Sequence, residues 1–182
     1  MKNSVTPQEI IHFWFVENGS EQWFQKDAEF DECIRARFLN AYNDALHDKT
    51  AEWRTTPEGR LAEILVLDQF ARNMFRGTPQ AFSGDQKALA LAKEAISAGD
   101  DTKLDSVQRQ FLYMPYMHSE SREVHEEAVA LFEKLGNPQT LEYEVLHKEI
   151  IDQFGRYPHR NSILGRESTP KEEEFLKNHE GF

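Results

Sequence analysis

The sequence has one cysteine, a deficit of positive charge and no long apolar run, and each shortage excludes a class of protein. The single cysteine, Cys33, rules out a disulfide within the chain and a zinc site built from several cysteines. Lys and Arg number 21 against 32 Asp and Glu, a formal net charge of −11. Because phosphate recognition needs a basic face, this balance argues against a nucleic-acid partner. No stretch approaches the roughly 20 apolar residues that cross a bilayer, so no membrane partner is predicted.

The beginning of the chain, MKNSVTPQEI, lacks the apolar core of a secretory signal. Together with the low cysteine content, this predicts a cytoplasmic location. The 182 residues suffice for one domain with a substantial core, and 13 Phe, 5 Tyr and 3 Trp supply bulky side chains for it. Since no linker or low-complexity segment divides the chain, a single domain over residues 1–182 is expected.

Helix boundaries are marked clearly in the sequence. TPQE at Thr6–Glu9 and TPKE at Thr169–Glu172 each offer an N-cap Thr, a Pro in the first turn and a Glu that bonds back to the cap. No stretch combines strand alternation with hairpin turn signals. The fold class is therefore all-α, with about eight helices stacked as antiparallel hairpins. The helices are predicted near residues 7–16, 27–48, 57–76, 84–98, 106–117, 121–135, 139–155 and 170–179, with stops at Gly19, Gly77, Gly99 and Gly136.

The helix RLAEILVLDQFARNMFRG begins apolar all round and then becomes polar on one side. Asp68 borders the polar side and stands four residues before Arg72, which is the spacing of an ion pair. One interpretation is that the polar half emerges into solvent. The other is that it faces an internal cleft, because Arg, Asn and Gln suit directed hydrogen bonds. The polar side carries Gln69, Arg72, Asn73 and Arg76.

Several histidines occupy unusual positions. His147 falls on a predicted apolar stripe of the helix near 139–155, where it is either a hydrogen-bonded core residue or part of a site. His118 and Glu120 precede the helix near 121–135, where they either enter a site or organise the turn. The histidines match no metal-ligand motif, and no dinucleotide or phosphate-loop motif is present, so no metal and no other cofactor is predicted. The predicted stripe consists of Tyr143, Leu146, Ile150, Ile151 and Phe154.

FGRYPHRNSILGRES concentrates cations in an acidic chain. We interpret it as a helix end followed by a loop that Pro158 stiffens. We expect this loop to pack beside the polar half of the helix near 57–76, so that both line one recess. The arginine side chains there have two possible roles. They either bind the carboxylate or phosphate of a ligand or only hold loops in place, and the structural role is favoured for Arg156 and Arg166. The loop also carries His159, Arg160 and Asn161.

Three functions follow from these residues. The first is binding of a small anionic molecule or a peptide terminus in an Arg- and His-lined pocket. The second is acid–base catalysis of a hydrolase kind by His147 or His159 beside Asp68. The third is a protein-interaction scaffold with a protein partner. The predicted ligand-binding residues are Asp68, Gln69, Arg72, Asn73, Arg76, His118, Glu120, His147, Arg156, His159, Arg160 and Asn161.

Long motifs in this chain resemble the bacterial domain-of-unknown-function family numbered 924. They are FWF at 13–15, WF at 23–24, LDQFARNMFRGTPQAF at 67–82, MPYMHSES from Met114 and FGRYPHRNSILGRESTPKEEEFL from Phe154. The resemblance implies an all-helical fold whose hairpins stack as in tetratricopeptide repeats, and it implies no reaction. It links the two polar segments, because both are signature segments of the family. His125 departs from the family, in which many members have Gln.

Overall fold

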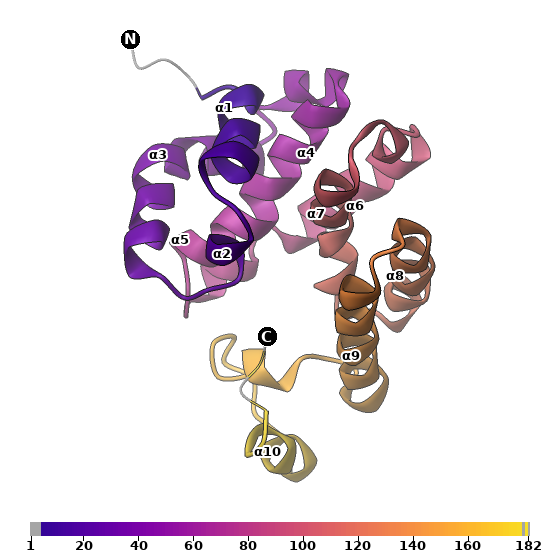
Figure 1. Ribbon diagram of the computed structural model, residues 1–182. Coiled ribbons are helices and arrows are strands. Elements are labelled where there is room, and N and C mark those ends of the chain that lie inside the picture. The colour runs from indigo at the N-terminus through magenta and orange to yellow at the C-terminus, as the bar shows by residue number, and fades with distance from the viewer. Residues whose placement is uncertain (1–4, 180, 182) are drawn as a thin grey trace. The chain divides into compact units, whose positions relative to one another are not determined.

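The protein is all-helical in the computed structural model, which describes residues 5–179 and 181. No strand occurs among those residues, which confirms the predicted fold class. Each predicted helix is found within a few residues of its expected bounds, and the short α2 is an addition that the sequence did not indicate. The helices are α1 (Pro7–His12), α2 (Ser20–Trp23), α3 (Ala28–Leu46), α4 (Pro57–Leu65), α5 (Ala71–Met74), α6 (Asp85–Ser97), α7 (Ser106–Met117), α8 (Arg122–Leu135), α9 (Pro138–Phe154) and α10 (Pro170–Leu176) (Figure 1).

The chain forms two compact units. The first comprises Met1–Arg76 and Gln80–Pro115, and the second comprises Gly77–Pro79 and Tyr116–Phe182. The boundary falls inside α7 at Pro115, a residue that cannot donate a backbone hydrogen bond and so interrupts the helix ladder. The single domain over 1–182 and the likeness to tetratricopeptide repeats both stay predictions.

In the first unit, α3 packs against α5, and α4 packs against α1 and α6. The face of α3 that points inward carries apolar side chains at three- and four-residue spacing. Trp14 and Trp23 stack with ring centroids 6.0 Å apart, and both contact the ring of Phe111. Aromatic packing of this kind supplies much of the unit's core. The buried residues of α3 are Phe30, Ile34, Phe38, Ala41, Tyr42 and Ala45.

The helical path from Pro57 to Met74 contains one π-helical turn, Val66–Phe70, between α4 and α5. Such a turn accommodates an extra residue and is found frequently at functional sites. Here the turn contains Asp68 and Gln69, and both are buried. The polar half of this helix therefore does not simply emerge into solvent, although Arg76 at its end is exposed.

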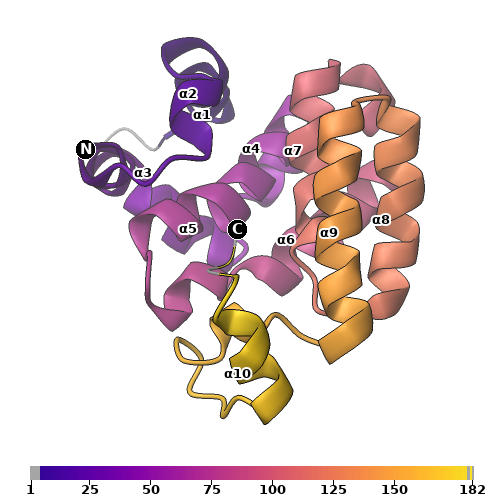
Figure 2. The same ribbon diagram turned by 60° about the horizontal axis from the view of Figure 1, so that its bottom comes forward.

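In the second unit, α8 and α9 form an antiparallel hairpin and lie side by side in both views (Figures 1 and 2). Gly136 ends α8 in the left-handed conformation, with a φ of 78°, as predicted, and Asn137 caps α9. Gly19 was predicted to end a helix in the same way, but this was wrong. Its φ is −158°, and it precedes α2 in an extended conformation.

The predicted apolar stripe of α9 is wrong at two positions. Tyr143 and Leu146 are exposed, at 48% and 42%. The buried face of α9 instead holds Glu144, His147 and Ile151, which are spaced three and four residues apart. Relative to the orientation that the apolar stripe predicts, α9 is rotated about its axis so that a carboxyl group and an imidazole enter the core. Hydrophobic periodicity alone does not predict this orientation.

Over the described part of the chain, no helix combines the length and the apolar character needed to span a bilayer.

The close approach of α4 to the preceding turn yields a test of the fold. A Cβ atom added at Gly59 would lie 1.9 Å from the carbonyl oxygen of Trp53. Although Ala is the better helix former, we expect Gly59→Ala to lower the free energy of unfolding by at least about 2 kcal/mol, because the backbone must shift. Urea denaturation followed by far-UV circular dichroism measures the change.

The matched control is Gly19→Ala. A Cβ atom there meets nothing within 4 Å, and the extended backbone accepts any residue. Its unfolding free energy should change by less than about 0.5 kcal/mol. Equal stability of the two variants would contradict the packing of α4 described above.

Candidate functional site

The predicted site residues fall into two groups, one in each compact unit. The polar residues from Asp68 to Arg76 belong to the first unit, and those from His118 to Asn161 belong to the second. Each group can therefore be described on its own. The expectation that both groups line one recess stays a prediction.

In the first unit, Asp68 and Arg72 form the predicted ion pair. Asp68 is 1% exposed, and Nη1 of Arg72 donates to its Oδ1 over 3.1 Å. Arg72 also binds both carboxylate oxygens of Asp85, at 2.7 and 2.9 Å, which the sequence did not reveal. Nε2 of Gln69 donates to the other oxygen of Asp68 over 2.7 Å. The guanidinium of Arg72 therefore lies between two carboxylates.

Asp31 on α3 receives the remaining predicted residues of this group. Arg76 donates to both of its oxygens, over 2.7 and 2.9 Å, and Nδ2 of Asn73 donates to one of them over 2.7 Å. The two arginines thus pair with three carboxylates. Arg72 contacts Asp68 and Asp85, and Arg76 contacts Asp31. This half of the predicted site forms an ion-pair network without surplus positive charge.

In the second unit, two arginines fasten the loop after α9 with two-pronged ion pairs. Arg156 donates to the two oxygens of Glu172 over 2.7 and 2.8 Å. Hydrogen bonds from Arg156 hold the pKa of Glu172 at about 2. Arg166 binds the two oxygens of Glu120 over 2.7 and 2.9 Å. This is the structural role that the sequence favoured for both arginines.

Glu120 and Asn161 complete this fastening. One oxygen of Glu120 also accepts the backbone N–H of Tyr157 over 2.8 Å. Burial raises the pKa of Glu120, but the hydrogen bonds from Arg166 and from the Tyr157 amide outweigh burial, so the pKa lies below its ordinary value. Oδ1 of Asn161 accepts Nε–H of Arg166 over 3.0 Å. These contacts tie the loop to the segment that precedes α8.

Tyr157 is fully buried at the centre of the loop, and basic side chains surround its ring. The guanidinium carbon of Arg160 lies 4.6 Å from the ring centroid. The imidazoles of His159 and His147 lie 5.4 and 5.7 Å from it, centroid to centroid. Nη2 of Arg160 donates to the carbonyl oxygen of His118 over 3.0 Å. We call His147, His159 and Arg160 around Tyr157 the imidazole cluster.

The histidines of the imidazole cluster are held in the neutral form. Burial lowers the pKa of His147 to about 3, with a further contribution from nearby positive groups that include Arg160. Burial and the charge of Arg160 lower the pKa of His159 to about 4. Nδ1–H of His147 donates to the carbonyl oxygen of Tyr143 over 2.6 Å, so Nε2 is the unprotonated nitrogen of the neutral ring.

A buried imidazole–carboxyl pair lies beside this cluster, and it involves residues absent from the predicted site. Nδ1 of His125 lies 2.6 Å from Oε1 of Glu144, and neither side chain is exposed. Nε2–H of His125 donates to the carbonyl oxygen of Ser119 over 2.8 Å, so that nitrogen carries a proton. Burial raises the pKa of Glu144, although its hydrogen bond with His125 opposes the shift. Burial therefore favours the protonated form of the Glu144 carboxyl within this hydrogen bond.

Nε2 of His125 also links the pair to Tyr157. The Tyr157 hydroxyl oxygen lies 3.2 Å from Nε2 and accepts its hydrogen, while the hydroxyl donates to the carbonyl oxygen of Met117 over 2.6 Å. Sequence reasoning missed Glu144 because the predicted apolar stripe of this helix was centred on Tyr143 and Leu146, which are exposed. The signal that could have identified it is its position three residues before His147.

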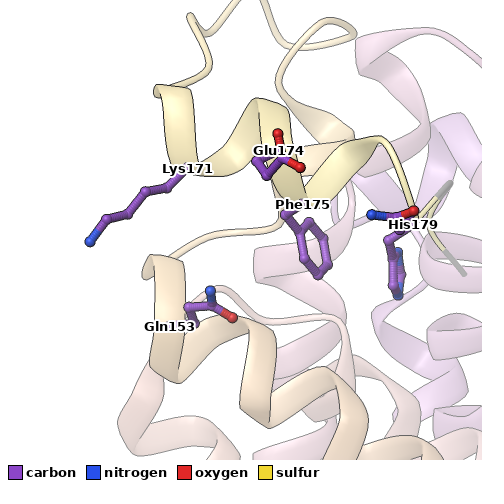
Figure 3. A pocket seen from close by; sticks show the side chains of 6 residues that line it. Gln153, Lys171, Glu174, Phe175 and His179 are labelled. Atoms are coloured by element: carbon purple, nitrogen blue, oxygen red, sulfur yellow. The ribbon is translucent and has the colours of Figure 1, made fainter.

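The second unit has an open groove elsewhere on its surface. It has a volume of about 470 Å³ and lies where α10 approaches the end of α9 (Figure 3). None of the predicted site residues lines it. Among residues 5–179 and 181, no group of three or more His, Cys, Asp or Glu side chains is placed to hold a metal ion. The groove is lined by Gln153, Lys171, Glu174, Phe175, Asn178 and His179.

The ion pairs of the first unit predict unequal effects of two arginine substitutions. Arg72→Ala removes a partner of the buried Asp68 and should cost about 2–4 kcal/mol of unfolding free energy. Arg76→Ala serves as the control, because its pair with Asp31 is more exposed and should cost about 1 kcal/mol or less. Chemical denaturation of both variants measures the difference. A loss at Arg72 no larger than that at Arg76 would show that water solvates Asp68.

The raised pKa of Glu144 predicts how the pH dependence of stability changes in Glu144→Gln. Because the folded-state pKa of Glu144 is raised, its contribution to stability is complete below the unfolded value of 4.5 and is lost as pH rises through the folded pKa. Gln cannot ionise, and its amide can donate to Nδ1 of His125. Above pH 4.5 the variant should therefore lose stability less steeply than the natural protein, by up to about 1.4 kcal/mol per pH unit.

Glu142→Gln, an exposed position on the same helix, is the control for the loss of one acidic charge. When unfolding free energies are measured across this pH range, the slope of stability against pH should be the same for Glu142→Gln as for the natural protein. Parallel curves for Glu144→Gln and the natural protein would mean that Glu144 is already ionised in the folded state.

The comparisons with known proteins agree with this architecture. Residues 10–180 match the model of a family described as bacterial protein of unknown function, DUF924. A solved structure, that of the protein of unknown function ATU0120 from Agrobacterium tumefaciens, is similar with a TM-score of 0.90 and 38% sequence identity. The match covers 94% of this chain and 96% of the other. A search of curated proteins finds no match. The chain therefore belongs to the bacterial DUF924 family.

Proposed function

We propose that this protein binds a small oxyanion, a carboxylate or a phosphate, at the imidazole cluster of its second unit. A small metabolite or the carboxyl terminus of a peptide would present such a group. Arg160 would supply the fixed positive charge, since a guanidinium forms strong, directed hydrogen bonds with either oxyanion. His147 and His159 would supply the proton-dependent part of the site.

The observation that carries the proposal is that the Arg160 guanidinium and the imidazoles of His147 and His159 all lie against the buried ring of Tyr157. The positive charge of Arg160 acts on Glu120 and on both histidines. An oxyanion that entered the cluster would be attracted by this charge and would accept hydrogen bonds from the guanidinium and from any imidazole that it causes to protonate.

The two units differ in this respect. Arg72 and Arg76 have three carboxylates as partners, whereas the cluster in the second unit combines Arg160 with imidazoles whose protonation its positive charge opposes. The geometry therefore favours the second unit as the ligand-binding part. The enzyme and scaffold alternatives, and the cytoplasmic location, stay predictions of the sequence.

A bound anion should raise the pKa of both histidines, because negative charge favours the imidazolium form. At a pH between the value of about 4 for His159 and the ordinary 6.5, binding should therefore take up protons. Sulfate is a suitable probe, since it does not itself titrate there. Calorimetry in buffers of different ionisation enthalpy should show proton uptake, and sulfate affinity should rise as pH falls.

Two substitutions and one control assign the effect to the cluster. Arg160→Gln should weaken sulfate binding at least about tenfold, because a charge-assisted hydrogen bond is lost. His159→Asn should bind with less proton uptake, while the control His47→Asn, at an exposed position, should not differ from the natural protein. N-acetylglycine in place of sulfate tests a peptide carboxyl terminus. Absence of binding, or binding without proton uptake, would refute the proposal.

A further inference from the structure

We propose that the outward face of α9 binds an amphipathic helix of a basic partner protein. The face lies on the side of α9 that the fold leaves exposed, and Figure 2 shows this helix along its length beside α8. The inference goes beyond the proposed function, because it concerns a protein partner and a surface that does not include the imidazole cluster. We call the exposed residues Gln139, Glu142, Tyr143, Leu146 and Glu149 the docking face.

The first observation is an apolar seam that is only partly covered. Tyr143, Leu146 and Ile150 are three and four residues apart, which is the spacing by which one helix packs along another. Ile150 is buried in a cluster with Ile151 and Tyr157. Tyr143 and Leu146, in contrast, are 48% and 42% exposed. The chain itself therefore covers one end of the seam, and the other end is available to a partner.

The second observation is the charge beside this seam. Glu142 and Glu149 are seven residues apart, so both flank the seam on the same side, and both are exposed. Neither carboxylate forms an ion pair within the described part of the chain, whereas Lys148 on the same helix pairs with Asp152. Two such carboxylates, about 10 Å apart along the helix axis, favour Lys or Arg side chains at matching positions of a partner.

The backbone of α9 explains why the partner segment should be helical. In the middle of a helix the N–H and C=O groups bond within the helix, so the docking face offers side chains only. An extended segment binds by adding backbone hydrogen bonds to a sheet edge, and the described residues contain no strand. A helix satisfies its own backbone and presents anchors at the same spacing as Tyr143 and Leu146.

A second copy of this chain fits the docking face poorly. Each copy carries a formal net charge of −11, so two copies repel each other. In an antiparallel pair of α9 helices, Glu142 and Glu149 of one copy would meet the same glutamates of the other. In a parallel pair they would meet the positions of Thr140 and His147, which are buried. The occupant is therefore a different protein, whose helix carries basic residues.

The test uses a labelled helical peptide of about three heptads, with Leu at the seam positions, Lys at the flanking positions and Ala elsewhere. Fluorescence anisotropy at physiological salt should show that this peptide binds the natural protein. Glu142→Lys combined with Glu149→Lys should weaken binding at least about tenfold, because attraction becomes repulsion. The same variant should bind a peptide with Glu in place of Lys more tightly than the natural protein does.

Two control variants in the first unit match these changes. Glu52→Lys combined with Glu58→Lys makes the same change in net charge at exposed positions and should alter the affinity less than about twofold. Leu146→Asp should weaken binding at least about tenfold, because it removes an apolar anchor of the seam. Its control is Val107→Asp, at a side chain that is 43% exposed, and this change should not weaken binding.

Each other outcome would overturn a stated part of the inference. Equal responses of the test and control variants would overturn the docking face, since the peptide would then follow net charge alone. Equal binding of the same peptide with Pro at its centre would overturn a helical occupant. A dimer of the natural protein in sedimentation that Leu146→Asp dissociates would assign the face to a second copy. Absence of peptide binding would overturn the inference as a whole.

Discussion

The second unit depends on the way Tyr157 is held. Its hydroxyl donates to the Met117 carbonyl and accepts from His125, its amide donates to Glu120, and its carbonyl accepts from Arg166. These polar contacts on one buried residue fix both the end of α9 and the start of the following loop. Because the Tyr157 ring cannot turn away, the basic side chains around it are held in place as well.

The two units reduce the cost of burying ionisable groups in different ways. Arg72 is satisfied by carboxylates from its own helix and from α6, an arrangement that stabilises packing and leaves little for a ligand. Around Tyr157 the buried groups are mostly bases, and the cost of burial is reduced by keeping His147 and His159 neutral. The two imidazoles are therefore uncharged, while Arg160 keeps its positive charge beside them.

The fold was largely predictable from the sequence because capping boxes and helix-stop glycines act locally. Thr6 with Glu9 and Thr169 with Glu172 form the expected reciprocal bonds. The site was less predictable. The carboxylate of Asp85 lies thirteen residues from Arg72, and Glu144 lies nineteen from His125, so no local spacing joins either pair. The rotation of α9 that buries Glu144 and exposes Tyr143 depends on packing against α8, which a single helix cannot encode.

The distribution of indole side chains has a practical consequence for spectroscopy. Trp14, Trp23 and Trp53 all belong to the first unit, where Trp14 and Trp23 stack on one another near Phe111. Intrinsic emission excited at the indole band therefore originates from that unit alone. Chromophores in the second unit, such as Tyr157, are phenolic. A protein whose two halves melt at different temperatures would show this as a discrepancy between indole fluorescence and ellipticity, without any introduced label.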